Sequence, residues 1–502
     1  MAAVDGGQAA EKRSLGEWQA LALAAQAITM VLSVAQSMVV VRLLSVDEFG
    51  MVGLALGAGG VLDVLQQFTI RSAAVKELAR DDDERHAQAV VLVAMALRML
   101  MVLPNAVIVF SAAGRLANGV YGQPELQFPI QLMALTMLLA GARSILENTL
   151  TGLQAFRTYY LYLICAFVLR LILFTVLVAG FQVNGYFYAE LGWGLVLTIG
   201  LLFLVPPRLG AWRGLPSWKR VKPIALAMLS LSLVLFLARL TNVWWRRGAT
   251  ALLGLMVSNE EVGLFHFGLG LAGQLLAFSG TLGTVYMPVM SRLARNDRRT
   301  FQRTLPENLT QVTVLFLYGA GALMLLSREV VWIMAGREYL QALPMVPALV
   351  MAFLVEALFG MLSNSALIPT GNDRWYLWSV LVGRGLSLGL FLGGLAWQGL
   401  WLGAWGFFVG LVPGLVLMLW SIRSRLEVRL FRPDLLPLLA LVSMWAGAAL
   451  LDWAVWWRLV LLLATSPVYV WWAIQRGMID LQALRDATGR LLLRVRGGEA
   501  ST

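Results

Sequence analysis

The chain has 502 residues, of which 59% are hydrophobic and only 13% are charged, and its mean hydropathy is +0.75. Soluble domains carry roughly 25% charged and about 45–50% apolar residues, so a soluble multidomain protein is excluded and lipid must surround most of the chain. Fourteen membrane spans of about 20 residues would use about 280 residues, which leaves little room for a domain outside the membrane.

The net charge is +11, from 39 Lys+Arg against 28 Asp+Glu. In a soluble protein this excess would suggest nucleic acid as a partner, whereas in a membrane protein it first indicates the positive-inside rule. The only cysteine is Cys165 and the only histidines are His86 and His266, so neither a disulfide framework nor a metal site is predicted. None of the four lysines follows a glycine, which excludes a phosphate-binding GxxxxGK[ST] loop and a nucleotide partner.

Apolar helical segments are predicted at fourteen places after a polar, cytoplasmic N-terminal tail (1–16). They lie near 18–44, 49–70, 88–113, 126–150, 159–180, 186–205, 224–247, 262–288, 308–327, 344–368, 377–396, 400–421, 436–452 and 457–475. No alternating pattern typical of transmembrane strands occurs. The predicted fold is therefore an all-α polytopic membrane protein with about 14 transmembrane helices.

Two lobes of six helices are predicted within this series, at 17–205 and 224–421. A basic cytoplasmic linker (206–223) joins them, a helix pair (436–475) follows them, and a cytoplasmic tail (476–502) ends the chain. Two lobes around a central cavity are typical of transporters.

An internal repeat supports the two lobes. Residues 45–62 (SVDEFGMVGLALGAGGVL) align without gaps on 258–275 (SNEEVGLFHFGLGLAGQL). The offset corresponds to about six helices, an even number, so both halves are expected to have the same orientation about an axis along the membrane normal. The glycine stripe Gly50, Gly53, Gly57 and Gly60 favours close helix packing over ligand contact.

The loops divide the basic residues unequally. The N- and C-terminal tails and the loops on one predicted side hold 27 of the 39 Lys+Arg residues, and the opposite side holds seven. The positive-inside rule then predicts both termini in the cytoplasm. Five further arginines lie within predicted spans.

Charge within spans is the strongest functional signal. An arginine at a bilayer centre costs about 2.5–3.5 kcal/mol on insertion scales, so it usually faces a cavity or a partner. Arg143 has Glu147 four residues later, which indicates a local salt bridge. For the other four arginines within spans there are two interpretations. Each either lines a cavity that binds an anion, or it pairs with a residue of another helix or extends its side chain to the membrane interface. The predicted substrate-binding residues are Arg98, Arg143, Arg170, Arg239, Asn242, Arg246 and Arg384.

Three acidic residues also lie within spans, namely Asp63, Glu190 and Glu356. Each is a candidate for taking up a proton or sodium ion that drives transport. The alternative for each is pairing with one of the arginines.

Several short motifs in order along the chain carry a resemblance to a known family. They are RLLSVDEFG (42–50), TGLQAF (151–156), EEVGLFHFGLG (260–270), VYMPVMSRL (285–293), GREYLQALPMVPALV (336–350) and PTGN (369–372). With these motifs the chain resembles, over about residues 15–425, the polysaccharide transporter or O-antigen flippase branch of the multidrug/oligosaccharidyl-lipid/polysaccharide (MOP) exporter superfamily.

The resemblance implies a flippase, not an enzyme, that moves an undecaprenyl-diphosphate-linked oligosaccharide across the bacterial inner membrane for O-antigen, capsule or exopolysaccharide synthesis. It implies no cofactor, and as partners the membrane lipid, a polysaccharide polymerase and a chain-length regulator. Relatives often carry an acidic residue in the seventh helix, where this chain reads NVWWRRG (242–248), so an ion-coupling role is not carried over there. The membrane potential is an alternative energy source.

Other functions stay open beside this one. A lipid II-type flippase or a MATE-like drug antiporter would use the same fold, but an antiporter of cationic drugs needs an acidic cavity. An O-antigen ligase or polymerase, from another class, would need a large periplasmic loop, and no predicted loop between spans exceeds about twenty residues.

Overall fold

The structure, a computed structural model, describes residues 15–63, 70, 74, 78, 83–153, 155–209, 218–230, 233–428, 436–450 and 453–475. Helices make up nearly all of these residues, and no strand occurs among them. The chain divides into two compact units. Unit 1 comprises Met1–Phe267 and Met334–Tyr339, and unit 2 comprises Gly268–Ile333 and Leu340–Thr502.

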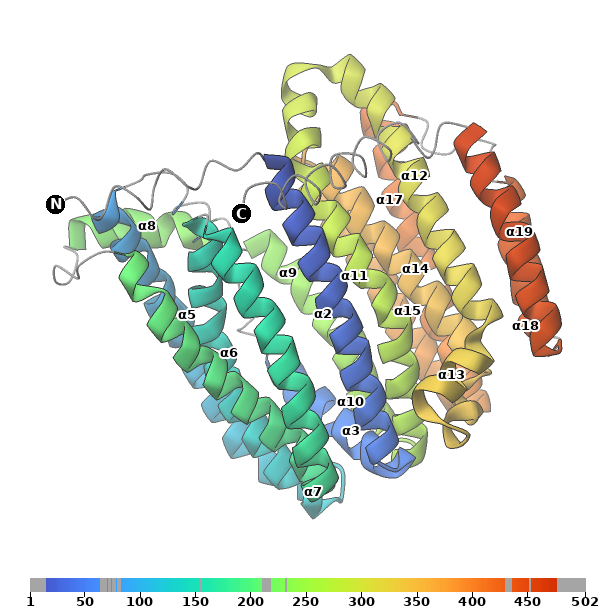
Figure 1. Ribbon diagram of the computed structural model, residues 1–502, viewed down its shortest axis with the longest axis horizontal. Helices are drawn as coiled ribbons and strands as arrows, with labels where there is room; N and C mark the ends of the chain where they lie inside the picture. The colour runs from blue at the N-terminus through green and yellow to red at the C-terminus, as the bar shows by residue number, and fades with distance from the viewer. Residues whose placement is uncertain are drawn as a thin grey trace, which may run out of the picture. The chain divides into compact units, whose positions relative to one another are not determined.

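Unit 1 is built from long helices that pack along their length. They are α2 (Leu15–Leu43), α3 (Val46–Leu62), α5 (Glu84–Gly114), α6 (Gln127–Gly152), α7 (Phe156–Leu204), α8 (Trp218–Ser230), α9 (Leu233–Val243), the π-helix η5 (Trp244–Gly248) and α10 (Ala249–Leu253). Helices α5, α6 and α7 run side by side, and α7 also packs on α2 (Figure 1). Short helices η2 (Arg115–Val120), η3 (Pro124–Leu126) and η4 (Pro206–Arg208) occupy the connections.

Helix α11 (Asn259–Asn296) runs from unit 1 into unit 2. The chain continues in unit 2 with α12 (Arg298–Leu325) and most of α13 (Ser327–Ala335), whose last residues belong to unit 1 together with the start of η6 (Glu338–Ala342). The remaining helices of unit 2 are α14 (Val346–Leu362), η7 (Ser363–Leu367), α15 (Asp373–Gln398), α16 (Leu400–Val409), α17 (Val412–Leu426), α18 (Leu436–Leu450) and α19 (Val455–Gln475). Helix α15 packs on both α16 and α17, and α12 packs on α14 and α18.

The predicted fold class is confirmed. Each of the fourteen predicted segments falls on helix over most of its described residues. Within the described residues, eight helices or merged helices are long and apolar enough to cross a membrane, so the chain is a multi-pass membrane protein. One of them contains two predicted spans, because α7 breaks at Gln182, whose φ of 50° and ψ of −126° are not helical. The predicted domain limits, which place the lobe boundary in 206–223, stay a prediction.

The internal repeat is visible in unit 1 as two equivalent helix starts. Ser45 caps α3, and its backbone N–H donates to Glu48 Oε2 at 2.8 Å while its hydroxyl accepts from Glu48 N at 3.2 Å. Ser258 and Glu261 form the same reciprocal pair at the start of α11, at 3.3 Å in both directions. Such a capping box satisfies backbone N–H groups that a helix start leaves unpaired.

The two helix starts also meet at their matching glycines. A Cβ atom on Gly50 would lie 1.8 Å from the Asn259 carbonyl oxygen, and one on Gly263 would lie 2.2 Å from that of Val46. Gly50 matches Gly263 in the repeat, and Val46 matches Asn259, so the contact is reciprocal. Only glycine permits this approach, as the sequence predicts for the stripe.

The repeat extends further, with the offset changing by only a few residues. Asp83 caps α5 in unit 1, and Asp297 caps α12 in unit 2. Gln88 Nε2 donates to the Leu209 carbonyl at 2.8 Å in unit 1, and Gln302 Nε2 donates to that of Leu426 at 2.9 Å in unit 2. These bonds tie the third helix of each six-helix half to the end of its sixth.

The terminal pair α18–α19 docks on α12 and α13 inside unit 2. Arg458 is 2% exposed, and its Nη2 lies 2.8 Å from Glu329 Oε1. The Tyr318 ring stacks on Tyr469 with 4.6 Å between ring centroids. The sequence counts Arg458 among the seven basic residues of the outer side, and its burial shows that it helps to fasten α19 to the helix bundle.

Candidate functional site

Arg384 and Glu356 form a closed ion pair between α15 and α14. Arg384 Nε donates to Glu356 Oε2 at 3.3 Å, and its Nη2 contacts the second carboxylate oxygen. The two side chains are only 5% and 6% exposed. Each charge therefore satisfies the other away from solvent, which is the structural alternative that the sequence left open for both residues.

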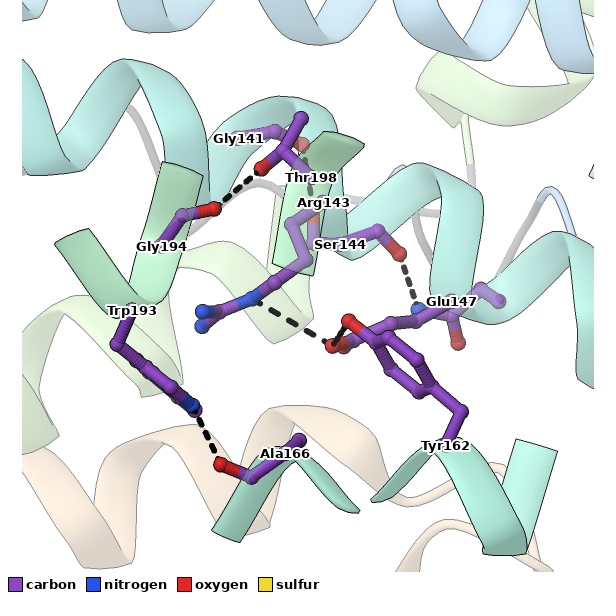
Figure 2. A network of polar contacts seen from close by, with 10 residues as sticks. Gly141, Arg143, Ser144, Glu147, Tyr162, Ala166, Trp193, Gly194 and Thr198 are labelled. Atoms are coloured by element: carbon purple, nitrogen blue, oxygen red, sulfur yellow. Dashed lines mark hydrogen bonds and ion pairs between the residues drawn. The ribbon is translucent and has the colours of Figure 1, made fainter. Parts of the chain in front are cut away.

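A second arginine also has a local partner, as the sequence predicts. Arg143 Nε lies 3.4 Å from Glu147 Oε1, one turn along α6. The Tyr162 hydroxyl of α7 donates to the same carboxylate oxygen at 3.4 Å. Figure 2 shows this network, with the Trp193 indole beside the guanidinium, whose carbon lies 4.2 Å from the ring centroid.

The same tryptophan contacts a third predicted arginine. Arg170 lies 4.7 Å from the Trp193 ring centroid and pairs with Glu190 at 3.1 Å. The Trp193 Nε1 donates to the Ala166 carbonyl at 2.8 Å (Figure 2). One indole is thus within cation–π distance of two guanidinium groups, and the arrangement fastens α6 to both halves of α7.

The fourth predicted group lies on α3 and α5. Asp63 ends α3, is 7% exposed, and accepts a hydrogen bond of 3.1 Å from Asn105 Nδ2. Arg98 is 8% exposed and lies seven residues before Asn105, hence on the same face of α5. The positive charges of Arg98 and Arg247 both act on the Asp63 carboxylate. By helical spacing in the sequence, Gln67 and Arg71 would share a face with Asp63, and both lie outside the described residues.

Arg247 completes this group from the π-helix η5. Its Nη1 lies 3.9 Å from Asp63 Oδ2, which is longer than a hydrogen bond, and its side chain is 44% exposed. Room for the guanidinium comes from Gly60, where a Cβ atom would lie 2.6 Å from Arg247 Nη1. We call Asp63, Arg98, Asn105 and Arg247 the Asp63 cluster.

The remaining predicted residues lie on the helix that leads to η5. Arg239 and Arg246 are exposed, and Asn242 is half-buried. The sequence places these three on one face by α-helical spacing. A π turn contains more residues than an α turn, and Arg247, one residue after the predicted Arg246, is the side chain that reaches Asp63.

Two members of the cluster, Asn105 and Arg247, were missed by the sequence. The doubled arginine in NVWWRRG was a signal, but the choice between the two arginines depends on helix register.

No group of three His, Cys, Asp or Glu residues that could hold a metal ion is present in the part of the chain that the structure describes.

Comparison with known proteins identifies the family. The family model described as polysaccharide biosynthesis protein matches residues 39–344, more than half of the chain, so the chain belongs to this family. No curated protein matches the sequence.

Solved structures show the fold. A lipid II flippase MurJ in an inward closed conformation superposes with a TM-score of 0.66 at 12% identity, over 92% of this chain and 99% of that chain. An inward-facing multidrug resistance MATE family transporter of the MOP superfamily gives 0.61 at 15% identity, over 80% of this chain and 94% of that chain. The chain therefore has the MOP superfamily fold that the sequence predicts.

Proposed function

We propose that the protein is a flippase that moves a polyprenyl-diphosphate-linked oligosaccharide from the cytoplasmic to the outer leaflet by alternating access. Membership of a polysaccharide biosynthesis family supports the glycan part of the cargo. The fold shared with a lipid II flippase and a MATE transporter supports transport. The chain makes and breaks no bond in this function; it carries its cargo across the bilayer.

The observation that carries the proposal is the geometry of the Asp63 cluster. A planar guanidinium binds phosphate oxygens through two parallel hydrogen bonds. Arg247 lies 3.9 Å from its carboxylate and is 44% exposed, so its donors can turn to an arriving diphosphate. Arg239 of α9 and Arg246 of η5 are also exposed. They add positive charge for binding the second phosphate.

Asp63 remains stabilised when Arg247 turns away. Asn105 donates to it at 3.1 Å, and the charge of Arg98 acts on it as well. Asp63 can therefore lose its contact with Arg247 when the cargo binds and form it again when the cargo leaves. This makes Asp63 the candidate for coupling to a proton or sodium ion, because Glu190 and Glu356 are each bonded directly to an arginine.

The membrane potential supplies a driving force that needs no ion-coupling acid. Moving two negative charges out of a cell that is negative inside by 100 mV yields roughly 4–5 kcal/mol. Export of a diphosphate-linked lipid is therefore favourable with the potential alone. No cofactor takes part.

The cellular setting follows from the same proposal. The protein lies in the bacterial inner membrane with both termini in the cytoplasm, as the 27 basic residues on one predicted side favour. A polysaccharide polymerase and a chain-length regulator act on the exported units. A cysteine-accessibility map that places the linker 206–223 outside the cell would contradict this topology.

A lipid II-type flippase is the second candidate, favoured by the TM-score of 0.66 with the lipid II flippase. Its cargo would meet the Asp63 cluster through the same diphosphate. Cationic drugs suit the site less well, because two arginines, Arg98 and Arg247, act on its one described carboxylate.

Complementation tests the function. The gene is expressed in bacteria that lack their surface-polysaccharide flippase, and exported polymer and cytoplasmic-leaflet precursor are measured. The wild-type chain should restore export, and Arg247→Ala should restore less than a tenth of it at equal protein level. Arg303→Ala, whose side chain is 86% exposed, is the matched control and should export normally. Restoration of lipid II transport, with no polymer export, would select the second candidate.

A further inference from the structure

A cavity of about 370 Å³ opens at one end of the unit 2 helices. Its walls come from the end of α11, the start of α12, the loop before α15 and the end of α17. Its polar lining consists of three arginine side chains (Arg295, Arg298 and Arg425), the hydroxyl of Thr370, and the side-chain amides of Gln302 and Asn372. No carboxylate is among its described lining residues. We call it the triple-arginine cavity.

The polar wall of the cavity is held in place by internal bonds. Gln302 Nε2 donates to the Leu426 carbonyl at 2.9 Å, which joins α12 to α17. Asn372 Nδ2 donates to Thr370 Oγ1 at 2.9 Å across Gly371, whose φ of +72° favours glycine. The PTGN motif that the family resemblance singled out therefore forms one wall.

The arginines themselves are exposed and available. The Arg425 guanidinium carbon lies 4.8 Å from the Trp375 ring centroid, which orients it without neutralising its charge. No ion pair joins Arg295, Arg298 or Arg425 to a carboxylate within the described residues. The nearby carboxylate of Asp297 is used as a helix cap and accepts from Thr300 N at 3.0 Å.

Unit 1 provides an internal comparison for this cavity, because its described residues repeat the same scaffold bond with different side chains beside it. Gln88 bonds the Leu209 carbonyl there as Gln302 bonds that of Leu426. The residue that follows the capping aspartate is Glu84 in unit 1, whereas it is Arg298 in unit 2.

The arginine before the accepting leucine also differs between the two units. In unit 1 it is Arg208, which donates to Thr158 Oγ1 at 2.9 Å and to the Leu204 carbonyl at 2.6 Å. Its donors are thus used within the protein, whereas those of Arg425 border the cavity. The glutamine-to-leucine bond that both units share does not require three guanidinium groups beside it. The three arginines in unit 2 therefore indicate a site for an anionic ligand.

We propose that the triple-arginine cavity binds a phosphate-bearing headgroup, a phosphate monoester or a diphosphate. Three guanidinium forks match the charge and the oxygen geometry of such a group, and the volume lies within the range of small-ligand sites. Basic pockets at the ends of transmembrane helices are suited to anionic lipid headgroups. The site shares no residue with the Asp63 cluster, since all of its lining residues belong to unit 2 and the cluster belongs to unit 1.

The test uses the full-length protein in nanodiscs of phosphatidylcholine. Binding of inorganic diphosphate, farnesyl diphosphate and phosphatidic acid is measured by titration. All proteins carry Arg247→Ala, so that the Asp63 cluster does not contribute, and one that is otherwise wild type is compared with two variants. Arg298→Glu gives unit 2 the residue of unit 1, and Arg303→Gln is the control, because it removes an 86% exposed arginine from the same helix. Both positions are exposed, so both variants should fold.

Arg298→Glu should weaken binding at least tenfold, the effect of losing about 1.4 kcal/mol, while Arg303→Gln should change it less than twofold. Tighter binding of the two lipid probes than of inorganic diphosphate supports the site and identifies a lipid source; equal binding supports it and identifies the free anion. Equal weakening by both variants, or no binding of any probe to the protein that carries only Arg247→Ala, overturns the proposal. Polymer export is not measured here, so this failure is distinguishable from failure of the proposed flippase function.

Discussion

Two carboxylate–arginine pairs, one in each unit, differ in how firmly they are closed. The Glu356 and Arg384 side chains are 6% and 5% exposed, and Arg384 Nε and Nη2 each bond one oxygen of the carboxylate. The Asp63 and Arg247 side chains are 10% and 44% exposed, and their nearest charged atoms are 3.9 Å apart. Separating a buried, bonded pair leaves two charges without solvent or partner, whereas Arg247 can leave its carboxylate at low cost. The first pair therefore holds helices together, and the second can exchange partners with a ligand.

Removing one member of the closed pair should give the largest loss of stability. Glu356→Ala leaves Arg384 buried without its carboxylate, and such a change costs about 3–5 kcal/mol. We expect a large fall in melting temperature in detergent and little folded protein in the membrane. The double variant Glu356→Leu/Arg384→Met should recover most of the loss, because it leaves no charge behind. A melting temperature of Glu356→Ala within a few degrees of wild type would contradict the closed character of this pair.

The tryptophan between Arg143 and Arg170 should have an intermediate effect. Trp193→Leu removes two cation–π contacts, worth about 0.5–2 kcal/mol each, and the hydrogen bond to Ala166. Thermal unfolding should show a clear loss of stability, while export by the surviving protein stays near normal, because this network joins helices. Trp397→Leu, at an 80% exposed position, is the control. Loss of export without loss of stability would place the network in the transport site.

Gly60→Ala should disturb the open pair with little effect on stability. The new Cβ would lie 2.2 Å from Arg247 Cδ, and the flexible arginine can move aside, away from Asp63. We expect a melting temperature close to wild type and export reduced several-fold. Gly389→Ala, where a Cβ would have nothing within 4 Å, should leave both unchanged. Full export by Gly60→Ala would show that the position of Arg247 is unimportant.

The smallest effect is expected at the exposed helix cap Asp297. Hydrogen bonds from the Thr300 hydroxyl and backbone lower the pKa of this carboxyl below its usual value. Because the folded pKa is lowered, the stabilisation is present at neutral pH and is lost as the pH falls through the folded pKa. Asp297→Ala should lower the melting temperature slightly at pH 7, with the difference shrinking below about pH 4. A difference that grows on acidification would contradict the cap.

Much of the fold could be predicted from the sequence, because hydropathy over some twenty residues suffices to locate a span. The match of SVDEFG to SNEEVG reappears as two capping boxes and two facing glycines. The pairing of Arg143 with Glu147 also followed from spacing alone.

The site was less predictable, since it depends on contacts between helices. Nothing in the sequence shows that Arg384 pairs with Glu356 or that Asn105 bonds Asp63. The π-helix at Trp244–Gly248 changes the register just before Arg247, so α-helical spacing selected the neighbouring Arg246. Nor does the sequence show that Arg458 pairs with Glu329 of another helix.

Transfer of cargo by the purified protein tests the central claim most directly. The protein is placed in proteoliposomes with a fluorescent polyprenyl-diphosphate-linked oligosaccharide, and the label that becomes inaccessible to an external quencher is followed with and without a membrane potential. Wild-type protein should move the lipid faster when the potential favours transfer of negative charge, and Arg247→Ala should slow transfer at least tenfold. Equal transfer by wild type, Arg247→Ala and protein-free liposomes would contradict both the flippase function and the role of the Asp63 cluster.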